Sequence, residues 1–405
     1  MTRLGMNTKK IIILDIIAIL ALFLFAGIFF YIDKKSNEAD KQNIISEQDS
    51  ALDTQANNSQ PSLIPDITKA PTTAPTSVPT ATPEPTPVVE EPIILTFAGD
   101  VNLDENSRPV QRYDRENKGI LGGISQDLLT EMIDADITMI NNEFAFSNRG
   151  TAIPNKSYTF RAKPSRVDIL KEMGVDIVSL ANNHALDFGI DALLDTFDTL
   201  EEAGIDYVGA GDTLERAKAA VYYTINDKTI AFLSASRVIY SVDWYATDTR
   251  PGMIGTYDPA LLLTCIEEAA ANSDYVIVYV HWGVERNHYP EDYQKKFAKQ
   301  YIDAGADAVI GSHPHVMQGI EMYRDKPIAY SLGNFWFNSS KRESGLLKLY
   351  LNPDGTITTQ LIPVMNDNTY TYMITDDEQK KSYFDFMEEL SFGVTIDEEG
   401  FVTAD

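Results

Sequence analysis

Five apolar, strand-like runs of the chain each end in side chains that can bind a metal ion or exchange a proton. These side chains are Asp100, Glu143, the pair Asn183 and His184, His281, and the pair His313 and His315. Ligand sites in open α/β sheets form outside the carboxyl ends of the strands. We therefore expect the five strand ends to converge on one edge of a sheet and to form a single site.

The donor types of this set indicate one or two divalent metal ions. Carboxylate, amide and imidazole groups are hard or borderline ligands that suit Mn, Fe, Zn or Mg. Four of the five histidines of the chain lie in these motifs. The single cysteine, Cys265, excludes a thiolate cluster, a Cys-x-x-Cys redox pair and an intramolecular disulfide.

The strongest ligand candidates are His313 and His315. In an extended segment, alternation places both side chains on one side, and Pro314 fixes the backbone between them. A single histidine at a strand end is more typical of a hydrogen-bonded structural residue, so the pair carries more weight than its members.

Strand-like and helix-like segments alternate from residue 91 onward, which indicates an α/β fold with helices on the faces of a sheet. The predicted strands are 93–97, 137–140, 176–180, 207–208, 229–233, 275–280 and 308–310. The predicted helices are 126–133, 165–173, 190–203, 259–271 and 291–304. Two hairpins, 221–225 with 229–234 and 346–351 with 356–362, predict a mixed rather than a purely parallel sheet.

The motifs GDVNL, NNEF, NNHALDFG, HWGVE, GSHPH and SLGNFWF occur in this order over about residues 93–340. In this order and spacing they resemble the CapA family of poly-γ-glutamate capsule biosynthesis, within the calcineurin-like metallophosphoesterase superfamily. The resemblance implies a layered αββα sandwich of mixed sheets that carries a two-metal site.

The resemblance also implies a role for each motif residue. One metal would be held by Asp100, Glu143 and His315, and the other by Glu143, Asn183, His281 and His313. Glu143 would bridge the two ions, and His184 would be the catalytic histidine. Asp187 would orient His184. Independently of the resemblance, Asp187 could cap the helix that begins near Gly189, and both roles could hold at once.

Two positions depart from the wider superfamily. Asn102 stands where that superfamily has a histidine, and Glu143 stands where it has an aspartate. Other polar residues near the motifs are candidates to support the metal ligands or to bind substrate: Asn102, Glu285, His288, Arg161, Lys163 and Asn334. The alternatives are ordinary loop polarity for Glu285 and His288, and turn geometry for Asn334. For Arg161 and Lys163, ordinary surface charge is the alternative to an anion clamp.

The N-terminal quarter predicts a membrane anchor and a spacer. Residues 11–32 form an apolar run interrupted only by Asp15, long enough for one transmembrane helix, with a cleaved signal peptide as the alternative. We expect 1–10 as a cytoplasmic tail, 33–91 as a Pro/Thr-rich extracytoplasmic linker, 92–365 as the CapA-like domain and 366–405 as an acidic C-terminal segment. The chain would thus be a single-pass membrane protein with its catalytic domain outside the cell.

The net charge of -27 argues against nucleic acid as a partner. Residues 93–405 carry 26 basic and 49 acidic side chains, so a polyanion is repelled by this part of the chain at large. Binding of polyglutamate would need metal cations or a local clamp such as Arg161 and Lys163. Two functional classes remain: a metal-dependent hydrolase or transferase acting on a phosphoester or a γ-glutamyl amide, and a non-catalytic, polymer-binding partner of a membrane polyglutamate synthase.

Overall fold

The computed structural model describes residues 91–405. The predicted cytoplasmic tail, the predicted anchor at 11–32 and nearly all of the predicted linker lie outside the described residues. Within 91–405, no helix combines the length and the apolar character that a membrane crossing requires.

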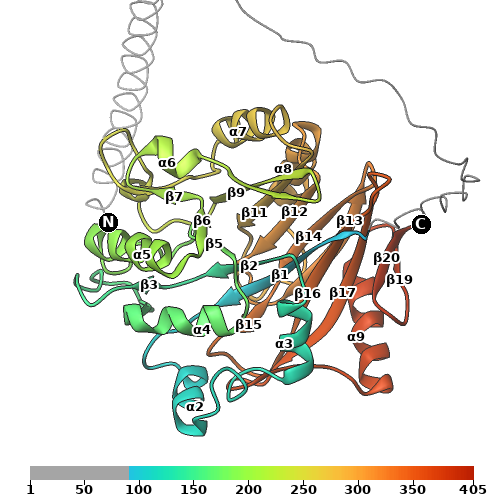
Figure 1. The fold of residues 1–405 in the computed structure, drawn as a ribbon, viewed down its shortest axis with the longest axis horizontal. Coiled ribbons are helices and arrows are strands. Elements are labelled where there is room, and N and C mark those ends of the chain that lie inside the picture. Colours follow the sequence, from blue (N-terminus) through green and yellow to red (C-terminus); the bar gives the residue numbers. More distant parts are fainter. Residues whose placement is uncertain (1–90) are drawn as a thin grey trace, which may run out of the picture. The chain divides into compact units, whose positions relative to one another are not determined.

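Two sheets form the centre of the molecule (Figure 1). The first pairs β19 (Val394–Ile396), β20 (Phe401–Ala404), β17 (Ile357–Asn366), β16 (Arg342–Leu351), β1 (Ile93–Val101), β2 (Ile137–Asn142), β5 (Ile177–Ser179) and β6 (Asp206–Val208), with β15 (Asn334–Trp336) beside β1 and β18 (Thr371–Met373) beside β17. The second pairs β13 (Met317–Tyr323), β14 (Lys326–Leu332), β12 (Ala308–Ser312), β11 (Tyr275–His281), β9 (Lys228–Ser236) and β8 (Val221–Ile225). Two short pairs lie apart from them: β3 (Ala145–Phe146) with β4 (Arg161–Ala162), and β7 (Ala210–Gly211) with β10 (Gly252–Met253).

Both sheets are mixed, as the two hairpins predicted. β1 runs parallel to β2 and antiparallel to β16, and β9 runs parallel to β11 and antiparallel to β8. All seven strands predicted from apolar runs are present, so the sequence located the strands whose ends carry the candidate ligands.

The helices are α2 (Arg108–Glu116), α3 (Gln126–Ile133), α4 (Val167–Glu172), α5 (Ile190–Ala203), α6 (Leu214–Lys218), α7 (Ala260–Ala270), α8 (Asp292–Asp303) and α9 (Asp377–Leu390). Short 3-10 turns cover Pro164–Arg166 and Val242–Trp244. The five predicted helices correspond to α3, α4, α5, α7 and α8, with ends that differ by at most two residues.

Alternating side chains of the central strands divide the core into layers. In β2, Met139 packs between the two sheets, whereas its neighbour Ile140 packs against the helices α2 to α5. In β11, Ile277 packs between the sheets, and Val278 packs against α7 and α8. Because successive strand side chains point to opposite faces, the two sheets lie face to face with helices on each outer side.

Residues 366–405, predicted as an acidic segment after the domain, belong to this fold. The boundary after residue 365 falls inside β17, and β18, β20 and β19 extend the first sheet beyond it. Helix α9 packs Tyr383, Phe384 and Met387 into the core between the sheets. The segment therefore completes the core, although its surface is acidic.

Gly99 allows the loop before Asn334 to pack directly on β1. The backbone N–H of Asp100 donates to the carbonyl of Gly333 at 2.9 Å, and a Cβ at Gly99 would lie 2.0 Å from that carbonyl oxygen. The glycine thus holds two polar residues of the site, Asp100 and Asn334, on adjacent segments.

We expect Gly99→Ala to destabilise the protein by about 1–3 kcal/mol, because the added methyl group must push two strands apart. Urea-induced unfolding of the variant checks this value. Gly355→Ala is the matched control: a methyl there meets no atom of residues 91–405 within 4 Å, so only the backbone strain of a positive φ remains. Equal stability of Gly99→Ala and wild type would contradict the close approach.

Candidate metal centre

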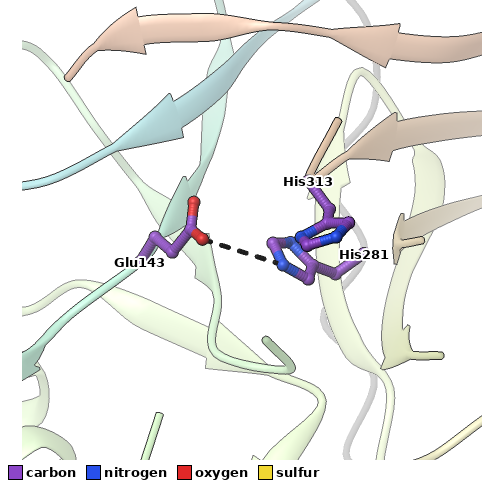
Figure 2. Close-up of side chains that lie close together, drawn as sticks. All are labelled: Glu143, His281 and His313. Carbon is purple, nitrogen blue, oxygen red and sulfur yellow. Dashed lines mark ion pairs between the residues drawn. The ribbon is translucent and has the colours of Figure 1, made fainter. Parts of the chain in front are cut away.

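Glu143 lies at the centre of the converging strand ends. It directly follows β2, and its side chain is fully buried. Its Oε1 atom has no hydrogen-bond partner within residues 91–405. This oxygen lies 3.8 Å from Nε2 of His184, 3.8 Å from Nε2 of His281 and 3.9 Å from Nε2 of His315. Figure 2 shows the carboxylate directed toward His281, with His313 beside it.

Two groups of potential metal ligands share Glu143. Glu143, His281 and His313 form one group, and Asp100, Glu143 and His315 form the other; within each group the ligand atoms lie within 4.8 Å of one another. A carboxylate has two oxygens and can therefore serve both groups. The structure thus brings together the residues that the resemblance assigned to two metals.

Asn183 joins the group that contains His281. Its Oδ1 atom lies 2.7 Å from Nε2 of His281, while Nδ1 of the same ring lies 3.0 Å from the hydroxyl of Ser312. Metal binding would require the tautomer with the proton on Nδ1, which can donate to Ser312 and leaves Nε2 free for an ion beside Oδ1 of Asn183. Nδ1 of His313 is buried without a hydrogen-bond partner in the described part of the chain.

His315 and Asp100 form the second side of the centre. Nδ1 of His315 lies 3.2 Å from Oδ2 of Asp100 and 2.8 Å from Oδ1 of Asn334. The Asn141 amide donates to Oδ1 of Asp100 at 2.8 Å and lies 3.2 Å from Nδ1 of His281. The sequence analysis did not select Asn141, although it stands two residues before Glu143 in a quoted motif.

Burial dominates the electrostatics of the centre. Burial and the nearby Asp100 raise the pKa of Glu143 well above its ordinary value. Burial lowers the pKa of His281 well below its usual range and that of His313 to about 3. Burial alone would lower the pKa of His315 and raise that of Asp100. The contact between the two outweighs burial, so the pKa of His315 is raised and the pKa of Asp100 is lowered. The lowered pKa values of His281 and His313 favour neutral rings, the form that coordinates a divalent cation, whereas the raised pKa values of Glu143 and His315 favour their protonated forms, so a metal bound by these two residues would displace protons.

The donor set fits a divalent metal ion. Two buried polar atoms, Oε1 of Glu143 and Nδ1 of His313, have no hydrogen-bond partner within 91–405. Buried polar atoms are normally paired, and a cation would satisfy both. The ligand types exclude a thiolate site and suit Mn, Fe, Zn or Mg.

His184 lies beside the ligand groups with its two nitrogens in different surroundings. Nδ1 is 2.6 Å from Oδ2 of Asp187, and Nε2 faces Glu143. Helix α5 begins after Gly189 without a side-chain cap in the described structure, so Asp187 is not the cap considered as an alternative. Oδ2 of Asp187 also accepts the N–H of Phe160 at 2.8 Å, and the Phe160 ring packs against His184 with 4.3 Å between ring centres and a tilt of 35°.

His313 and His315 converge on Glu143 by a different route from the one predicted. The expectation of an extended segment is wrong, because both residues have left-handed backbone, with φ of 98° and 57°. In an extended segment both side chains would point to one side and could serve a single ligand group. The left-handed backbone at each residue instead directs His313 to the group of His281 and His315 to the group of Asp100. Left-handed non-glycine residues cluster at functional sites, where the surrounding structure holds the strain.

The remaining candidates belong to neither ligand group within residues 91–405. Oδ1 of Asn102 accepts the backbone N–H of Asp104 at 2.8 Å. Glu285 is exposed, and its negative charge contributes to raising the pKa of His315. His288 lies 2.9 Å from the carbonyl of Met317 through Nδ1 and packs on Phe386.

The two cationic candidates, Arg161 and Lys163, are held by protein groups. The Arg161 guanidinium donates to the carbonyl of Arg149 at 2.8 Å, and Lys163 pairs with Glu105 at 3.3 Å. Their function as an anion clamp stays a prediction. A different lysine, Lys156, contacts His184 and Asp187. No motif surrounds Lys156 in the sequence, and the analysis of strand ends did not find it.

Residues 94–339 match the family described as bacterial capsule synthesis protein PGA_cap. The chain belongs to this family. The matched range covers more than half of the chain and contains every residue of the two ligand groups as well as His184. The PGA_cap match therefore confirms the resemblance to capsule biosynthesis proteins that the motifs indicated.

Individual relatives agree with the family assignment. The chain is 36% identical over 217 residues to "Capsule biosynthesis protein CapA" of Bacillus anthracis, covering 52% of each chain. It is 33% identical over 208 residues to a "Probable polyglutamine synthesis accessory protein" of Mycobacterium tuberculosis, covering 49% of this chain and 55% of that one. The chain thus aligns with about half the length of the curated relatives it matches. Among solved structures, it is similar to the NAD nucleotidase of Haemophilus influenzae, with 13% identity, a TM-score of 0.39 and coverage of 74% of this chain and 63% of that one.

Proposed function

We propose that the chain is an extracytoplasmic protein of poly-γ-glutamate capsule biosynthesis or export, anchored in the cell membrane by residues 11–32. Within that process we propose a two-metal hydrolase or transferase of the metallophosphoesterase type, acting on a phosphoester or a γ-glutamyl amide. The family assignment and the names of the relatives support the process.

The observation that carries the enzymatic part is the unpaired, buried Oε1 of Glu143 facing three imidazoles at 3.8–3.9 Å. Glu143, Asn183, His281 and His313 would hold one ion, and Asp100, Glu143 and His315 the other. A pair of divalent ions supplies Lewis acidity and activates water near neutral pH.

In this mechanism His184 moves a proton at Nε2. The Nδ1–H group stays hydrogen-bonded to Asp187, so a protonated ring has only its Nε2–H available to donate to the leaving group. Phe160 covers one face of the ring and, with the Asp187 contact, limits its rotation. The acidic composition repels a polyanion, so binding of an anionic substrate would rely on the ions or on a local clamp such as Arg161 and Lys163.

A second candidate is a non-catalytic, polymer-binding partner of a membrane polyglutamate synthase. The relative from Mycobacterium tuberculosis is named as an accessory protein, which favours this role. The two candidates differ in turnover, because both would use the same metal-stabilised fold.

Metal analysis of the full-length chain is the first test. We expect one or two divalent transition-metal ions per chain, and a rise in Tm on adding Mn or Zn to the metal-free protein. At free metal about 100-fold above Kd, the expected gain in the free energy of unfolding is about 2.7 kcal/mol. Absence of metal together with an unchanged Tm would refute the metal centre.

A paired assay then separates the two candidates. Hydrolysis of bis(p-nitrophenyl) phosphate or of a γ-glutamyl oligomer by the metal-loaded chain supports the enzyme. If the chain is inert on both and a membrane polyglutamate synthase is recovered with it in a pull-down, the accessory role is correct.

A further inference from the structure

Lys156 is nearly buried beside the metal-ligand groups, yet it is neither a metal ligand candidate nor part of a motif. It lies in the loop between β3 and β4, and its side chain is 11% exposed. Its ammonium contacts the carboxylate of Asp187 and the backbone carbonyl of Asn183, and lies 3.2 Å from Nδ1 of His184. A buried lysine with these partners calls for an explanation, because a cation loses its hydration when it is buried.

The contacts of Lys156 complete the set of donors around Asp187. This carboxylate is fully buried. Lys156 occupies Oδ1, whereas Oδ2 accepts the N–H of Phe160 and faces Nδ1 of His184 at 2.6 Å. With Oδ1 held by Lys156, the carboxylate cannot rotate away from the imidazole without losing a charged hydrogen bond.

The same ammonium holds the peptide that precedes the imidazole. The carbonyl of Asn183 belongs to the residue whose side chain contacts His281 at 2.7 Å. Lys156 therefore links the segment of the proposed metal ligand Asn183 to the carboxylate that faces His184. The Lys156 ammonium thus holds both the peptide before His184 and the carboxylate that faces the imidazole.

A second loop closes over Lys156. Its ammonium lies 5.2 Å from the ring centre of Trp244 and 6.0 Å from that of Tyr240, within the range of a cation–π contact. Trp244 is buried, and the Tyr240 hydroxyl donates to the carbonyl of Pro154 at 3.2 Å, two residues before Lys156. The lysine is thus held in place from two elements.

We propose that Lys156 is a positioning residue: it holds Asp187 and the Asn183 carbonyl so that His184 keeps Nδ1–H on Asp187 and presents Nε2 to the metal-ligand groups. The alternative is a purely structural cation that balances the charge of Asp187. The two differ in whether the imidazole itself changes when Lys156 is removed.

The test uses Lys156→Met in the full-length chain, with side-chain ¹⁵N and ¹H NMR of its five histidines. His184→Gln identifies the His184 signal by difference. We expect a downfield Nδ1–H resonance in wild type that is broadened or lost in Lys156→Met. Lys171→Met, an exposed lysine of α4 paired with Asp168, is the matched control and should leave the resonance unchanged.

A lower Tm with an unchanged Nδ1–H resonance in Lys156→Met would overturn the proposal in favour of the structural cation. The kinetic arm rests on the proposed hydrolase activity: with unchanged metal content, kcat should fall about 10–100-fold while KM changes little. An unchanged kcat in an active enzyme would also overturn it. If wild type proves inactive, the hydrolase proposal fails, while the NMR arm still decides the role of Lys156.

Discussion

Glu143→Gln is expected to abolish the binding of both metal ions in the full-length chain. Glu143 is the residue that the two ligand groups share, and the neutral amide offers one weak oxygen donor in place of two anionic ones. At free metal about 100-fold above the wild-type Kd, elemental analysis should therefore find less than a tenth of the wild-type metal, which corresponds to a loss of about 4 kcal/mol or more of binding free energy at each ion.

The same substitution should not destabilise the metal-free protein. In the absence of metal, Oε1 of Glu143 is buried without a partner in the described structure, and an unsatisfied buried group costs about 1–3 kcal/mol. The metal-free variant is therefore expected to unfold at the wild-type Tm or above it. Adding Mn or Zn should raise the Tm of wild type alone.

Glu202→Gln, at an exposed glutamate of α5, is the matched control and should keep metal content and the metal-dependent rise in Tm. Retention of both ions by Glu143→Gln would show that Glu143 is not the shared ligand. Loss of a single ion would place it in one group only.

The sequence predicted the location of the site because strand ends are local features. Each candidate metal ligand lies within a few residues of the end of an apolar run, and parallel neighbours such as β1, β2 and β5 must end at the same edge. The pattern needs no knowledge of long-range packing. For the same reason the helix boundaries, which depend on local periodicity and turn residues, are close to those observed.

Features that depend on long-range contacts did not follow from the sequence. Lys156 reaches His184 across 28 positions of the chain from a loop without a regular pattern. The left-handed backbone of His313 and His315 is imposed by the fold, because histidine does not adopt a positive φ as readily as glycine does. The acidic composition of 366–405 concealed the buried face of α9, whose apolar residues recur at helical spacing among charged ones.

His184→Ala is expected to lower turnover strongly while leaving the metal ions in place. His184 belongs to neither ligand group among the described residues, and its nitrogens face Asp187 and Glu143. Removal of a general acid lowers rates by about 10²–10⁴-fold. The expected result is therefore wild-type metal content and a fall in kcat of that size on the substrate that the wild-type chain cleaves.

His288→Ala is the matched control for this substitution. Its ring contacts the carbonyl of Met317 and the ring of Phe386, and it belongs to neither ligand group within 91–405. We expect it to retain metal and activity, with a modest loss of stability from the missing hydrogen bond. Loss of metal in His184→Ala would instead make His184 a ligand. Full activity in His184→Ala would show that this residue transfers no proton in the mechanism. Catalysis would then rest on the metal centre alone, because no other imidazole of the described chain faces Glu143 from outside the two ligand groups.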